Sequence, residues 1–272
     1  MKELLTRTIS GIMIVLIVLG SILLAGYSML ALILVIFSFA LLEFRTMFGL
    51  KNQVLFFMVL AGGQLILILG YLAFAGILGY IYLSAGTAIL LSFMLLLSLL
   101  SGKISIRETG HYLFSLTWIA GTLLLFLALG WKSKTDTYHP LMPLLLIIMI
   151  WVYDIGAYVF GSLLGKTPMA PKISPGKSWE GFVAGILLNG IAGLLVFRIT
   201  GLLDLGAWLI LSLIVSLGAT AGDLLESKLK REAGVKDSGH LIPGHGGMLD
   251  RFDSLLISAP LFYIFLQIFS LS

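Results

Sequence analysis

The fold of this chain is decided by a long uncharged stretch, Asn52–Gly102, which reads NQVLFFMVLAGGQLILILGYLAFAGILGYIYLSAGTAILLSFMLLLSLLSG. A second uncharged stretch covers Thr8–Leu42. Because one membrane-spanning helix needs about 20 apolar residues, each stretch is long enough for two crossings. We place the turns at Gly26–Ser28 and within Phe74–Gly79, where glycine interrupts the apolar run. The two stretches together predict four membrane helices.

The rest of the 272-residue chain has the same character, with 59% hydrophobic and 11% charged residues. Soluble domains carry about 25% charged residues, so a soluble globule is excluded. The apolar runs are continuous rather than alternating, which favours helices over a barrel. We therefore predict an all-α, polytopic integral membrane helical bundle of about nine transmembrane helices. The expected spans are 8–25, 30–48, 54–73, 80–100, 112–131, 140–164, 179–197, 202–226 and 253–271.

The basic residues predict the orientation of the bundle. With nine spans and a cytoplasmic N-terminus, only Lys132, Lys134 and Arg198 of the 17 Lys and Arg residues lie outside. This bias follows the positive-inside rule, so we expect a multi-pass protein of the cell (inner) membrane. The N-terminal segment also has the pattern of a cleaved signal peptide, but we favour a retained first span. The chain has no cysteine, which excludes disulfides, thiolate metal sites and a cysteine nucleophile.

Two polar loops set the C-terminal half apart. We divide the chain into residues 1–135, a helical scaffold with potential dimer contacts, and residues 136–272, a catalytic region with cytoplasmic loops at 165–180 and 227–253. Both loops are rich in Gly, Pro, Lys and Ser. Lysine, arginine and glycine N–H groups bind phosphate, and a helix N-terminus follows the second loop. The alternative is a solvated loop that contacts lipid headgroups.

Neither loop contains a complete P-loop. Gly165-Lys-Thr167 and Gly176-Lys-Ser178 resemble the end of that motif, but the first glycine of the pattern is missing in both. We therefore reject a Walker-type nucleotide site.

Four carboxylates of the C-terminal half predict a metal site. Asp154 lies well inside the sixth span, where a carboxylate is costly unless it is paired; its alternative role is a structural ion pair. Asp223 lies near the inner end of the eighth span, and Asp250 and Asp253 are expected on one face at the start of the ninth. Mg²⁺ takes one or two carboxylates plus phosphate oxygens. We choose Asp223 and Asp250 as its ligands. Helix N-terminal capping is the alternative for Asp250 and Asp253, but it explains only one of them and not the pair.

Zinc is a poorer fit. His240 and His245 are the candidate ligands, but zinc requires three or four nitrogen, sulfur or oxygen ligands. We instead expect His245 to bind phosphate by a hydrogen bond or to orient Asp250.

The second loop carries a family signature. It reads Ser227-x-Leu229-Lys230-Arg231-x-x-x-x-Lys236-Asp237-x-Gly239-x-x-Ile242-Pro243-x-His245-Gly246-Gly247-Met248-x-Asp250-Arg251-Phe252-Asp253. This segment resembles the signature of the phosphatidate cytidylyltransferases, or CDP-diacylglycerol synthases. The first loop, from Pro171 to Gly181, is similar to the second polar segment of that family. Asp154 and Tyr158 fit the helix that precedes it.

The resemblance implies a reaction in which CTP and phosphatidic acid give CDP-diacylglycerol and pyrophosphate in phospholipid biosynthesis. It also implies Mg²⁺ dependence, an integral membrane enzyme and a homodimer. It carries over Asp223 and Asp250 as metal ligands. A second cation such as K⁺ stays open, and no nucleic-acid partner is expected.

The residue roles are hypotheses that combine this resemblance with the chemistry of the side chains. Positioning and electrostatics supply most of the catalysis, because two anions must be brought together. The predicted catalytic residues are Asp223, Asp250, Lys236, Arg251 and Asp253. The predicted nucleotide, phosphate or cofactor contacts are Lys230, Arg231, Asp237, His245, Gly246, Gly247, Lys172, Ser174, Lys177 and Asp154.

Three other functions stay open at this point. A CTP-dependent kinase of a polyprenol-type lipid would transfer the γ-phosphoryl group instead. A secondary transporter would use Asp154 and Asp223 as intramembrane carboxylates, although no internal repeat supports it. A scaffold that only binds anionic lipid would tolerate Asp250→Asn, whereas the enzyme would not.

Overall fold

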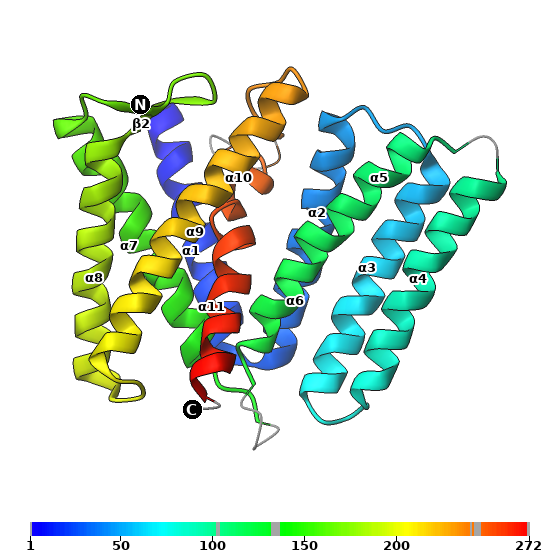
Figure 1. Cartoon of the computed structure of the whole chain (residues 1–272), viewed down its shortest axis with the longest axis horizontal. Coiled ribbons are helices and arrows are strands. Elements are labelled where there is room, and N and C mark those ends of the chain that lie inside the picture. Colours follow the sequence, from blue (N-terminus) through cyan, green and yellow to red (C-terminus); the bar gives the residue numbers. More distant parts are fainter. Residues whose placement is uncertain (1, 102–103, 132–136, 240, 242–245, 271–272) are drawn as a thin grey trace. The chain divides into compact units, whose positions relative to one another are not determined.

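The computed structural model describes residues 2–101, 104–131, 137–239, 241 and 246–270. Most of the described chain is helical (Figure 1), and it forms two compact units. Unit 1 comprises Met1–Pro143 and Asp237–Arg251, and unit 2 comprises Leu144–Lys236 and Phe252–Ser272. The end of the second polar loop therefore belongs to unit 1, and its beginning to unit 2.

Unit 1 is a helical bundle built from the first five expected spans. Helix α3 packs between α2 and α4, and the helix that runs from α5 to α6 packs on α3 as well (Figure 1). The fifth span is one helix without a break, and its middle turn, η1, is π-helical. The elements are α1 (Lys2–Leu24), α2 (Gly26–Met47), α3 (Gln53–Phe74), α4 (Tyr80–Leu100), α5 (Ile106–Ser115), η1 (Leu116–Ala120) and α6 (Gly121–Ala128).

Glycine determines where the first four helices turn. The chain breaks at Ala25, and a Cβ on Gly26 would lie 2.8 Å from the ring of Trp131. Only glycine allows that ring to pack against the turn. The break between α3 and α4 contains Gly76 with a φ of +69°, a conformation that other residues rarely adopt. Both breaks lie where glycine interrupts the apolar sequence.

Unit 2 places helix α9 against both α8 and α11 (Figure 1). A two-stranded antiparallel hairpin, β1–β2, connects α7 to α8. The carboxylate of Glu180 ties the hairpin to α8, because it accepts the N–H groups of Lys166 and Thr167 at 3.1 and 3.2 Å. The elements of unit 2 are α7 (Leu141–Leu164), β1 (Pro168–Ala170), β2 (Ser174–Ser178), α8 (Trp179–Thr200), α9 (Leu205–Glu232) and α11 (Leu255–Ser270). The short helix α10 (Leu249–Phe252) belongs to unit 1 up to Arg251.

Small residues and one amide hold the helices of unit 2 together. A Cβ on Gly181 of α8 would lie 2.8 Å from the Cα of Gly161 on α7, so the two backbones touch. Such close approach is typical of membrane helix pairs. The fully buried Asn189 of α8 donates to the carbonyl of Ser212 and to the hydroxyl of Ser216 on α9, both at 3.0 Å. These contacts fix α9, which carries Asp223.

The expected membrane helices are confirmed for eight spans. Eight described helices are long and apolar enough to cross a membrane, and the first apolar segment, Thr8–Leu24, is shorter. The chain is thus a multi-span membrane protein. The fifth helix begins earlier than predicted, at Ile106, because the polar residues before position 112 continue the helix.

The structure differs from the predicted ends of two spans and adds detail to the first polar loop. Residues 227–232 extend α9, where the i,i+4 pairs Glu226–Lys230 and Lys228–Glu232 support the helix. Residues 168–178, within the first polar loop, form the hairpin. The ninth span is interrupted between α10 and α11, so Asp250 is helical and Asp253 is not. The two aspartates therefore do not share one continuous helix face.

Candidate active site

The centre of the candidate site in unit 2 is an ion pair between the hairpin and α9. The amine of Lys177, near the end of β2, lies 2.6 Å from a carboxylate oxygen of Asp223. The other oxygen of Asp223 accepts a hydrogen bond from the hydroxyl of Ser227, one helical turn away, at 3.2 Å. Asp223 is therefore held by partners on two elements, and its side chain stays 36% exposed.

Two further carboxylates surround this pair. Asp154 of α7 and Asp253 both interact electrostatically with Asp223 and with Lys177. The backbone of Asp253 lies directly against α9, because a Cβ on Gly222 would collide with the carbonyl oxygen of Asp253. We call Asp154, Asp223, Asp253 and Lys177 the carboxylate cluster.

Ser254 links two members of the carboxylate cluster. Its hydroxyl donates to Asp154 at 3.3 Å, and its N–H donates to the side chain of Asp253 at 2.6 Å. The side chain of Asp154 is exposed, and that of Asp253 is partly exposed. The cluster is thus ordered by hydrogen bonds, and neither carboxylate is fully covered by the protein.

The donor set of the carboxylate cluster suits a hard divalent cation, which prefers oxygen ligands. Within the described ranges, however, no group of three or more His, Cys, Asp or Glu side chains has the geometry to hold a metal ion. The amine of Lys177 already contacts Asp223. Lys177 thus provides positive charge where a cation would bind.

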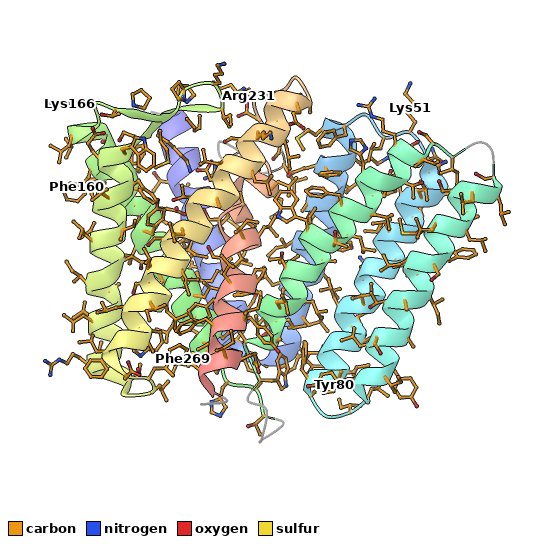
Figure 2. All side chains as sticks on the ribbon, in the orientation of Figure 1. Lys51, Tyr80, Phe160, Lys166, Arg231 and Phe269 are labelled. Carbon is orange, nitrogen blue, oxygen red and sulfur yellow. The ribbon has the colours of Figure 1, made fainter. Side chains whose placement is uncertain are left out.

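The predicted phosphate-binding residues of unit 2 gather at one end of that unit. The guanidinium of Arg231, at the end of α9, donates to the carbonyl of Ile173 in the hairpin turn at 3.4 Å. Figure 2 shows Arg231 and Lys166 at this end and Phe269 at the other end of the unit. Lys172 and Lys236 are exposed, and Ser174 is partly exposed.

Lys230 differs from Arg231, Lys172 and Lys236 because it is mostly buried and pairs with an acid. Its amine lies 2.5 Å from a carboxylate oxygen of Glu226, and the side chain of Lys230 is only 14% exposed. Glu226 itself is buried, at 1% exposure. The buried carboxylate of Glu226 therefore holds the amine of Lys230 close to the helix, near the C-terminal end of α9.

In unit 1, the end of the signature segment folds around Asp250. One oxygen of Asp250 accepts the N–H groups of Gly247 at 2.9 Å and of Ser238 at 3.3 Å. Gly246 has a φ of +83°, and a Cβ there would lie 2.8 Å from the same oxygen. Gly246 thus leaves room for the carboxylate of Asp250, and the N–H of Gly247 donates to it. Asp237 and Arg251 are exposed, and His245 lies outside the described residues, as does His240.

A carboxylate that the sequence analysis did not single out lies in the same unit. Glu43 of α2 is 7% exposed and accepts the N–H groups of Met248 at 2.7 Å and Leu249 at 2.9 Å. Its second oxygen also accepts the hydroxyl of Ser238 at 3.3 Å. An acidic residue near the end of an apolar helix was the available signal, because a carboxylate at that position needs partners.

The structure brings some of the predicted residues together. Asp154, Asp223, Asp253 and Lys177 form the carboxylate cluster in unit 2, while Asp250, Gly246 and Gly247 lie in unit 1. The pairing of Asp223 with Asp250 joins residues of different units and stays a prediction. Sequence reasoning missed Glu43, Ser238 and Ser254, whose contacts come from distant parts of the chain.

Known proteins resemble this chain in sequence. Three curated relatives are named phosphatidate cytidylyltransferase. The protein from Haemophilus influenzae is 44% identical over 136 residues, which cover 48% of this chain and 47% of that protein. The protein from Staphylococcus haemolyticus is 37% identical over 186 residues, or 68% of each chain. The protein from Staphylococcus saprophyticus is 37% identical over 187 residues, again 68% of each chain.

The matched segment thus spans about half of the Haemophilus protein and about two thirds of the staphylococcal proteins. A family model described as the cytidylyltransferase family matches residues 5–269. Because this match covers nearly all of the 272 residues, the chain belongs to the cytidylyltransferase family, which is a family of nucleotidyltransferases.

Proposed function

We propose that the chain transfers the cytidylyl group of CTP to phosphatidic acid, giving CDP-diacylglycerol and pyrophosphate. The observation that carries the proposal is the carboxylate cluster at Lys177, an accessible site in a membrane protein of the cytidylyltransferase family. The names of the relatives add the acceptor, because they are phosphatidate cytidylyltransferases.

The reaction joins two anions. A phosphate oxygen of phosphatidic acid attacks the α-phosphorus of CTP, and the bond from that phosphorus to the α–β bridging oxygen breaks. Pyrophosphate leaves with the electron pair. The attacking oxygen is already ionised at neutral pH, so no general base is required. The protein must therefore supply positive charge and alignment.

The basic end of unit 2 matches this requirement. Arg231, Lys236 and Lys172 are exposed and would neutralise the triphosphate and the leaving group. Lys177 would exchange its contact with Asp223 for a phosphate oxygen when substrate binds. Arg251 of unit 1 is a further exposed candidate for a phosphate contact. These basic residues neutralise charge without moving a proton.

We propose Mg²⁺ as the cofactor, with Asp223 and Asp250 as its ligands and with Asp253 and Asp154 in supporting positions. The support is the oxygen donor set and the exposure of Asp223 and Asp154. When bound, Mg²⁺ neutralises nucleotide phosphate charge and polarises the phosphorus. A second cation such as K⁺ would be bound by Asp237 or Asp253.

We further propose a homodimer in the cell (inner) membrane, with the polar segments facing the cytoplasm. The support for this orientation is the distribution of Lys and Arg along the sequence. It places the basic end of unit 2 in the compartment that holds CTP.

Product formation and metal removal test the proposed reaction. Purified protein in mixed micelles with CTP, phosphatidic acid and Mg²⁺ is expected to form CDP-diacylglycerol, detected by mass spectrometry of the lipid fraction. Excess EDTA should stop the reaction, and added Mg²⁺ should restore it, because the uncompensated charges repel each other.

Omitting phosphatidic acid is the matched control and should leave no liponucleotide. Phosphorylation of an added polyprenol, without any liponucleotide, would contradict the proposal and favour the kinase. Full activity in excess EDTA would contradict the Mg²⁺ assignment alone.

A further inference from the structure

The signature segment of unit 1 is held by a carboxylate from a helix that lies far away in the sequence. Glu43 of α2 receives donors from both sides of this segment, from Ser238 on one side and from Met248 and Leu249 on the other. The sequence separations are 195, 205 and 206 residues. One buried side chain thus binds Ser238, Met248 and Leu249, all of which lie within the family signature.

The same segment contains two glycines that face this carboxylate. A Cβ on Gly239 would lie 2.7 Å from one oxygen of Glu43, and a Cβ on Gly247 would lie 2.6 Å from the other. Any larger residue would push the segment away from α2. Both glycines belong to the signature quoted above, so part of that pattern is explained by packing against Glu43.

Ser238 couples these contacts of Glu43 to the predicted metal ligand. Its hydroxyl donates to Glu43, and its N–H donates to Asp250. Gly247, which also donates to Asp250, directly precedes the residue whose N–H donates to Glu43. A displacement of Glu43 would therefore move both donors that hold the Asp250 carboxylate.

We propose that Glu43 is a positioning residue, which holds the signature segment so that Asp250 keeps its orientation for the reaction. This inference rests on the proposed function, in which Asp250 is a metal ligand. Glu43 acts only through the segment and does not touch substrate. Residues that orient a metal ligand typically change metal affinity or activity about 10- to 100-fold when they are replaced.

The first test uses Glu43→Gln, which keeps the size of the side chain but replaces one acceptor oxygen by a donor. We expect an increase in the Mg²⁺ concentration for half-maximal activity and a fall in kcat/KM for CTP, each by about 10-fold or more. Glu43→Asp retains the charge and should recover part of the loss. Ser238→Ala, which removes one donor, should show a smaller change in the same direction.

The matched control is Glu108→Gln in the same unit. Glu108 also accepts a backbone N–H, but from Asn52, which lies at the start of α3 and outside the signature segment, at 2.6 Å. It should leave the Mg²⁺ response unchanged. Equal effects of the two substitutions on Mg²⁺ response and thermal unfolding would reduce Glu43 to a general structural role and overturn the proposal.

Hydrogen exchange provides a readout that does not depend on activity. In Glu43→Gln the amides of Met248 and Leu249 should exchange at least about 10-fold faster than in the original protein, because their acceptor is weakened. Unchanged exchange would overturn the proposal even if activity fell. If the original protein forms no liponucleotide, the proposed function fails, whereas faster exchange would still establish that Glu43 holds the segment.

Discussion

Asp223→Asn is expected to lower the rate of CDP-diacylglycerol formation by about 1000-fold. The substitution removes the charge that pairs with Lys177 at 2.6 Å and a carboxylate oxygen that a hard cation prefers. The protein should remain folded, because the side chains of the pair are 25% and 36% exposed. Such pairs contribute only about 0 to 1 kcal/mol to stability. Initial rates and thermal unfolding in the same detergent measure both effects.

Asp204→Asn is the matched control on the same helix. Asp204 caps the N-terminus of α9, where its side chain accepts the N–H of Ala207 at 2.8 Å. Asparagine caps a helix about as well as aspartate, so rate and stability should both stay near those of the original protein. An Asp223→Asn protein that retains a tenth or more of the rate would contradict the role assigned to Asp223.

Lys177→Met should cause the second largest loss, about 100-fold in kcat/KM for CTP. Lys177 is the cation that interacts with Asp154, Asp223 and Asp253. Without it, three carboxylates would repel the anionic substrates. Lys177→Arg should recover part of the activity, since it restores the charge in a different geometry. Steady-state kinetics at several CTP concentrations measure the change.

Lys166→Met separates this local effect from the general charge of the hairpin. Lys166 is exposed at the same end of unit 2 (Figure 2), and its backbone N–H donates to Glu180. It should stay within about threefold of the original activity, as expected for a solvated surface charge. A Lys177→Met protein as active as Lys166→Met would contradict the proposed neutralisation.

The membrane helices could be predicted because their signal is local. Uncharged runs such as Asn52–Gly102 have the length and hydropathy that a span requires, and glycines mark where they turn. The boundaries at the polar ends were less accurate. The residues after Glu226 are good helix formers with i,i+4 partners. They extend α9 beyond the end of its apolar sequence.

The sequence also draws attention to the carboxylates of the cluster, but not to all of their partners. Asp154, Asp223 and Asp253 are unusual for their position in apolar helices or at their ends, so sequence alone draws attention to them. That Lys177 contacts Asp223 depends on how the hairpin folds back onto α9. No local pattern encodes that distance.

Glu43 shows this limit most clearly. It lies in the half of the chain that was interpreted as a scaffold, and its partner Met248 is 205 residues away. Its acidic side chain was visible in the sequence, whereas the three donors that satisfy it were not. The glycines at 239 and 247 were assigned to the signature before their packing reason was known.

The most direct test of cytidylyl transfer follows the phosphorus atoms of CTP. Purified protein in mixed micelles receives phosphatidic acid, Mg²⁺ and CTP labelled at either the α or the γ position, with Asp223→Asn in parallel. We expect the α label to enter the lipid and the γ label to leave as pyrophosphate, and we expect the variant to lose both. Transfer of the γ label into a lipid would contradict cytidylyl transfer.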